Sequence, residues 1–77
     1  MKVNVFLREN ETSNVQYERD IEELQKTCTK HEFVVDYSDV EGDYPLLSVY
    51  DDNENLIDIW EYTWNKTDIY YWLWGMA

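Results

Sequence analysis

The chain has 77 residues, of which 17 are acidic and six are Lys or Arg, so its formal net charge at pH 7 is −11. A chain of this length makes one domain, residues 1–77, with room for a single small core. The charge predicts no direct binding to nucleic acid and no attraction to anionic membranes, and it favours a protein partner with a basic surface.

Cysteine and histidine usage exclude several kinds of site. The single cysteine, Cys28, cannot form an internal disulfide, and no Cys/His cluster predicts a metal site, so we expect no cofactor. No basic and apolar leader opens the chain, and no apolar run approaches the length of a membrane span. These features predict a cytoplasmic protein.

The first half of the chain predicts a strand, a helix and a second strand. Residues 2–8 alternate between apolar and other side chains, as a strand does. Ser13 and Gln16 form a capping-box pattern, which predicts that a helix begins there. Helical spacing continues to about Lys30 through four residues: Tyr17, Ile21, Leu24 and Cys28. Residues 32–37 alternate again, and a right-handed crossover would make them parallel to the first strand.

The second half predicts an antiparallel hairpin and a closing helix. Two apolar runs, residues 46–50 and 56–60, flank a polar turn and follow the only proline, Pro45. Simple alternation places four apolar residues of the hairpin on one face: Leu47, Val49, Ile57 and Ile59. Asn65 can cap a final helix whose apolar face holds Ile69, Trp72 and Leu73. The sequence therefore predicts an α/β fold, βαβ-ββα, with a four-stranded mixed sheet and two helices mainly on one face.

The second face of that sheet has no helix to cover it, because too few residues join the second and third strands. Alternation gives this face an aromatic centre with acidic surroundings, and its apolar members are Phe6, Val34, Tyr50 and Trp60. Such a patch is either covered by its own side chains or is a binding site. Under the second interpretation, Tyr50 and Trp60 are partner-binding residues.

The order of elements resembles the glutaredoxin-like branch of the thioredoxin fold. Residues 2–8 are similar to that family's first strand, and Asp43-Tyr44-Pro45 to its short segment ending in a cis proline. Glu11-Thr12-Ser13-Asn14 stand where the family carries its Cys-x-x-Cys pair, and Glu61-Tyr62 where it often has Gly-Gly. The family's middle helix is reduced to the loop 38–44. The resemblance implies a minimal thioredoxin-like domain that is redox-inactive and not an enzyme.

The resemblance also implies a place for a partner. In relatives, the loop before the first helix, the proline turn and the segment after the fourth strand meet and hold an extended chain, with strand addition to the third strand. The partner-binding residues implied here share that end of the fold, and they are Glu11, Thr12, Asp43, Tyr44, Pro45, Tyr62 and Trp64. Glu61 adds a further carboxylate that favours a basic partner.

Three functions remain open on the sequence. A redox-inactive binding protein, encoded by a phage and acting on a host protein, fits the small size and the acidity. An acidic DNA mimic that inhibits a nucleic-acid-binding protein fits the net charge and the aromatic content. A glutaredoxin-like oxidoreductase that uses Cys28 is disfavoured, because that cysteine is predicted on the apolar face at the far end of the helix.

Overall fold

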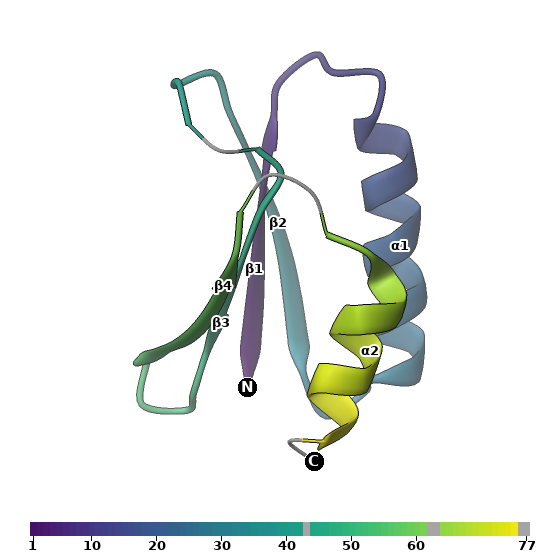
Figure 1. Cartoon of the computed structure of the whole chain (residues 1–77), viewed down its shortest axis with the longest axis vertical. Coiled ribbons are helices and arrows are strands. Elements are labelled where there is room, and N and C mark those ends of the chain that lie inside the picture. The colour runs from purple at the N-terminus through teal and green to yellow at the C-terminus, as the bar shows by residue number, and fades with distance from the viewer. Residues whose placement is uncertain (43, 62–63, 76–77) are drawn as a thin grey trace.

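A computed structural model describes residues 1–42, 44–61 and 64–75, and it contains one mixed sheet and two helices. In chain order the elements are β1 (Lys2–Arg8), α1 (Asn14–Thr27), β2 (Glu32–Ser38), β3 (Leu46–Tyr50), β4 (Leu56–Trp60) and α2 (Lys66–Gly75). The strand order is β2-β1-β3-β4 (Figure 1). β1 runs parallel to β2, and β3 is antiparallel to both β1 and β4. The predicted α/β class and the parallel first pair are confirmed.

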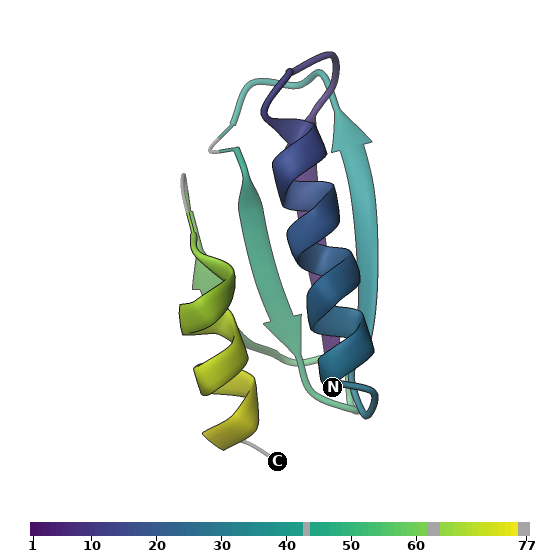
Figure 2. The same ribbon diagram turned by 90° about the vertical axis from the view of Figure 1, so that its right-hand side faces the viewer.

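Both helices lie on the same side of the sheet, as predicted (Figure 2). The side chains between the sheet and the helices form the core, and they are Val3, Val5, Leu7, Ile21, Leu24, Leu47, Val49, Trp64, Ile69 and Leu73. Burying this apolar surface is the main source of stability in a domain without a disulfide. Within the described ranges, neither helix has the length and apolar character that crossing a membrane requires.

α1 begins directly after Ser13, as predicted, but the capping box does not form and the helix ends earlier than predicted. Ser13 precedes the helix, but its side chain caps no backbone amide. Gln16 does not complete a capping box either, because its Nε2 donates to Oδ1 of Asp20 at 2.9 Å. The helix ends at Thr27 rather than near residue 30, since Cys28 leaves the helical backbone with φ −111° and ψ 64°.

The pairing of β3 with β4 contains an irregularity that the sequence did not reveal. Tyr50 pairs with Leu56, but the preceding residue of β3, Val49, pairs with Asp58. Ile57 is therefore an extra residue on β4, which makes a β-bulge. From Asp58 to Trp60, each β4 residue pairs with a β3 residue one position away from the partner that a regular hairpin would give it.

The bulge turns the rest of β4 over. A slip of one residue exchanges the two faces of a strand, so Trp60 lies on the helix side and Ile59 on the other side. Trp60 packs edge-on against Trp72 of α2, with ring centroids 5.3 Å apart. Ile57 and Ile59 are 42% and 43% exposed. The prediction that Ile59 faces the helices and Trp60 the uncovered side is wrong, and Ile57, which was predicted to face the helices, is exposed at the bulge.

α2 begins and packs as predicted. The Asn65 side chain accepts hydrogen bonds from the backbone amides of Thr67 at 2.8 Å and Asp68 at 3.3 Å, so it caps the helix. Ile69 and Leu73 are fully buried against the sheet. The cap sets where α2 starts, and the two apolar residues set which side of it meets the core.

Candidate functional site

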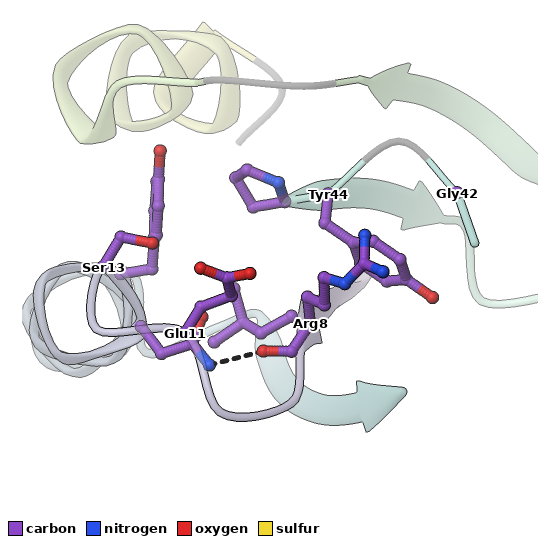
Figure 3. A pocket seen from close by; sticks show the side chains of 9 residues that line it. Arg8, Glu11, Ser13, Gly42 and Tyr44 are labelled. Atoms are coloured by element: carbon purple, nitrogen blue, oxygen red, sulfur yellow. Dashed lines mark hydrogen bonds between the residues drawn. The ribbon is translucent and has the colours of Figure 1, made fainter. Parts of the chain in front are cut away.

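A pocket of about 290 Å³ lies where the end of β1, the start of α1 and the turn before β3 meet (Figure 3). We call it the proline pocket. It brings together Glu11, Tyr44 and Pro45, which the sequence proposed as partner-binding residues, and adds Arg8 and Ser13. Segments far apart in the chain thus share one cavity.

The turn before β3 builds one wall of the proline pocket. The peptide bond between Tyr44 and Pro45 is cis. Pro45 is buried, and Tyr44 is half-buried. A Cβ atom on Gly42 would lie 3.5 Å from Cε2 of Tyr44, so the tyrosine ring lies against the backbone of Gly42. This contact keeps the ring beside the cavity.

The loop between β1 and α1 builds the opposite wall, and Asn14 holds that loop in place. Its Nδ2 donates to the carbonyl oxygen of Arg8 at 2.7 Å, and its backbone amide donates to the carbonyl oxygen of Glu11 at 3.2 Å. Asn14 is only 8% exposed. As a result, the Glu11 carboxylate points into the pocket between Ser13 on one side and Arg8 and Tyr44 on the other (Figure 3).

This arrangement predicts that the neighbouring polar residues Ser13 and Asn14 contribute unequally to the free energy of unfolding. Asn14→Ala should lower the free energy of unfolding by about 1–2 kcal/mol, because it leaves the partly buried carbonyl of Arg8 without its donor. Ser13→Ala should change it by less than about 0.5 kcal/mol, since the serine side chain caps nothing. Urea unfolding of both variants checks this. Equal losses would show that Ser13 caps α1 after all.

The two charged residues of the proline pocket, Arg8 and Glu11, are not paired with each other. Arg8 and Glu11 are both exposed, and neither forms an ion pair with any other described residue. A carboxylate and a guanidinium beside a tyrosine ring can bind a basic side chain at Glu11 and a carbonyl or carboxylate at Arg8. The pocket is therefore suited to binding polar groups of an extended chain.

The other predicted partner-binding residues do not gather at this pocket. Thr12 is exposed but does not line the cavity. Trp64 is 7% exposed and packs against Tyr17 with ring centroids 4.9 Å apart, so it belongs to the core. Trp60 packs on α2, and Tyr50 lies on the uncovered sheet face, away from the helices. Asp43 and Tyr62 lie outside the described residues.

The predicted strand addition to the third strand has little room. From Leu47 to Tyr50, β3 pairs with β1 on one side and β4 on the other, so it is an interior strand. Only the turn residues Tyr44 and Pro45 and the first strand residue, Leu46, precede its pairing with β4. A bound chain at the proline pocket would therefore meet the turn and not a free strand edge.

Six of the nine residues that line the pocket were not among the predicted partner-binding residues, and they are Leu7, Arg8, Ser13, Asn14, Tyr17 and Gly42. Arg8 is the last residue of an alternating strand, where a charged side chain is unremarkable. Asn14 was assigned to the helix start only as one member of the segment that replaces a cysteine pair. Its side-chain amide, next to a predicted helix start, was the one signal for a hydrogen bond to the preceding loop.

A second group of charges joins the two helices beside the pocket. Lys66 at the start of α2 pairs with Glu23 of α1 and lies 3.9 Å from Oδ1 of Asp20. The hydrogen bond from Lys66 and its charge lower the pKa of Glu23, and the same hydrogen bond raises the pKa of Lys66. These side chains hold α1 against α2, so we assign them to the fold.

Cys28 lies at the opposite end of α1 from the proline pocket, which Ser13 and Asn14 line at the start of that helix. It is half-buried against the core, as predicted, and with His31 it lines a cavity of about 170 Å³. His31 is 9% exposed, and burial, followed by the charges of the N-terminus and Lys30, lowers its pKa. No group of three or more Cys, His, Asp or Glu residues in the described ranges is arranged to hold a metal ion.

Comparison of the chain with protein-family models, with curated proteins and with solved structures gives no match. Any assignment of function therefore depends on the chain's own geometry and on the resemblance in its order of elements.

Proposed function

We propose that the protein is a redox-inactive binding protein on a minimal thioredoxin-like scaffold, which holds an extended, basic segment of a partner protein at the proline pocket. The observation that carries this proposal is the convergence of Glu11, Tyr44 and Pro45 on one cavity of about 290 Å³. The strand order β2-β1-β3-β4 and the cis bond before Pro45 support the thioredoxin-like part of it.

The position of Cys28 supports a role without redox chemistry. Thiol–disulfide exchange needs a thiolate, which helix N-termini favour, whereas Cys28 caps the C-terminal end of α1 and is half-buried. The start of α1 beside the proline pocket carries Ser13 and Asn14 instead. We expect no reduction of insulin disulfides by the wild type, and no difference between the wild type and Cys28→Ser in that assay. Thiol-dependent activity lost in this variant would favour the oxidoreductase.

The partner chemistry follows from the charge of the pocket and of the whole chain. Glu11 offers a carboxylate inside the cavity, and the net charge of −11 attracts cationic segments over a longer range. Tyr44 offers a partly exposed aromatic ring of the kind that dominates binding energy at interfaces. An extended peptide can contact both groups if a Lys or Arg side chain pairs with the Glu11 carboxylate and a neighbouring planar or small side chain packs on the Tyr44 ring.

Selection of peptides from a random library on the immobilised protein tests the proposal. We expect enrichment of Lys and Arg, and a loss of affinity of about tenfold in Tyr44→Ala for the selected peptide. Tyr71→Ala is the matched control, because this tyrosine is 64% exposed on α2, outside the pocket, and should change affinity by less than about twofold. Selected peptides without basic residues, or equal losses in both variants, would contradict the proposal.

The DNA mimic remains the second candidate, and it is favoured by the excess of 17 acidic over six basic residues. It expects that duplex DNA competes with this protein for a DNA-binding partner and that affinity falls gradually with each carboxylate removed, wherever it lies. The binding protein proposed above instead expects a loss that is concentrated at Glu11 and Tyr44. Comparing Glu11→Gln with Glu22→Gln on an isolated partner separates the two.

A further inference from the structure

The sheet face that points away from the helices, which we call the open face, carries an aliphatic strip along β4. Register places Lys2, Tyr50 and Leu56 on one rung across β1, β3 and β4. The next rung on this face holds Asn4, Ser48 and Ile59. Three β4 residues are exposed, at 54% for Leu56, 42% for Ile57 and 43% for Ile59. Leu56 and Ile59 belong to the open face by register, and the bulge residue Ile57 is exposed between them along the same edge strand.

Next to this strip the open face is hollow and acidic. A cavity of about 330 Å³ is lined by Lys2, Asn4, Asp36, Tyr50, Asp51 and Glu54. Three carboxylates and one ammonium line it, so the cavity carries a net negative charge. The Asp51 carboxylate accepts hydrogen bonds from the backbone amides of Asn53 and Asn55, both at 2.9 Å, so it belongs to the hairpin. Across the described ranges, the carboxylates of Asp36 and Glu54 have no ion pair or hydrogen bond.

The spacing of the two features suits a helix. The hollow is lined from β2, β1 and β3, and the aliphatic strip lies on β4, so the middle strand of the hollow, β1, is two strand spacings, about 10 Å, from the strip. This is close to the diameter of an α-helix with its side chains. A helix placed along β3 would direct one side to the hollow and the other to the strip. The length of β3, about 17 Å, corresponds to about 11 helical residues.

Two other occupants fit less well. A second copy of this chain would bring two net charges of −11 together across acidic hollows. An added β-strand would need donors at the β4 edge, yet the backbone amide of Ile59 donates to Oδ1 of Asp58 at 2.8 Å. The Asp58 carboxylate therefore competes with an added strand for the Ile59 amide, and charged side chains on edge strands commonly prevent such pairing.

We propose that the open face docks a basic amphipathic helix of a partner protein. Its apolar stripe covers Leu56, Ile57 and Ile59, and its Lys or Arg side chains enter the hollow beside Asp36 and Glu54. The inference extends the proposed binding function to a second surface, and it does not use the proline pocket. Failure at one surface therefore leaves the other to be judged by its own variants.

A 15-residue peptide of leucine and lysine, with the leucines at helical spacing, tests this docking by isothermal titration at 150 mM salt. We expect Ile59→Asn and Glu54→Gln each to weaken binding by about fivefold or more. Matched controls on α1 are Val15→Asn, which removes an exposed apolar side chain, and Glu22→Gln, which removes an exposed carboxylate. Both controls should stay within about twofold of the wild type. All four positions are exposed, so the variants should fold.

Three outcomes would overturn the inference. Losses in Val15→Asn and Glu22→Gln equal to those on the open face would mean that net charge alone attracts the peptide. Unchanged binding in Ile59→Asn and Glu54→Gln would place the peptide elsewhere, and a loss in Tyr44→Ala would then identify the proline pocket as its site. Sedimentation that shows a dimer dissociated by Ile59→Asn would make a second copy the occupant.

Discussion

Trp60→Ala should lower the free energy of unfolding by about 3 kcal/mol, whereas Ile59→Ala, one residue away, should lower it by less than about 1 kcal/mol. The bulge at Ile57 directs the Trp60 ring onto Trp72 of α2, with centroids 5.3 Å apart, so truncation leaves a gap between the sheet and the helix. Ile59 is 43% exposed on the other face, and its truncation opens no cavity.

Urea unfolding of the two variants measures this difference, with the slope of the unfolding curve checked for two-state behaviour. Both residues belong to the same short strand and both have high β-propensity. The difference between the two unfolding free energies therefore reports which side chain is packed against the helix. A larger loss in Ile59→Ala than in Trp60→Ala would mean that β4 follows simple alternation, without the bulge.

Ile69→Ala should also cost about 3 kcal/mol, because its side chain is fully buried between α2 and the sheet. At about 0.05–0.15 kcal/mol per residue, a domain of this size has only about 4–12 kcal/mol of stability in total. The loss is therefore a large share, and the variant should unfold at a clearly lower urea concentration. Circular dichroism during urea titration measures it.

Tyr71→Ala is the control for α2, since this residue is 64% exposed on the same helix. It should change the unfolding free energy by less than about 0.5 kcal/mol. A small effect of Ile69→Ala would show that α2 is not docked through this residue. The pair thus tests whether one helical layer covers the core.

The order of elements could be predicted from the sequence because each helix or strand shows a clear hydrophobic periodicity or a residue that marks its start. Alternation in residues 2–8 and 32–37 gave the parallel pair, and the Asn65 amide gave the start of α2. The face of β4 could not be predicted, because one bulge residue exchanges the two faces and no local signal marks Ile57 as that residue. The start of α1 after Ser13 was predicted correctly, but the capping hydrogen bond that the pattern implies does not form.

The candidate site was predictable in part. Glu11, Tyr44 and Pro45 share a cavity as the family resemblance implied, because the turn before β3 and the loop after β1 lie at the same end of adjacent strands. Trp64 was proposed as an exposed anchor, but it packs on Tyr17 in the core. A tryptophan just before a helix that packs on another helix is buried by that contact, which the sequence pattern does not reveal.

β4 exposes its aliphatic side chains, Leu56, Ile57 and Ile59, instead of burying them against the helices. The chain has four isoleucines, and δ1-methyl labelling with a soluble gadolinium chelate reports the solvent exposure of each. We expect strong relaxation of the Ile57 and Ile59 methyl signals and protection of Ile21 and Ile69, which are 5% and 0% exposed. Protection of Ile57 and Ile59 to the level of Ile69 would contradict the account.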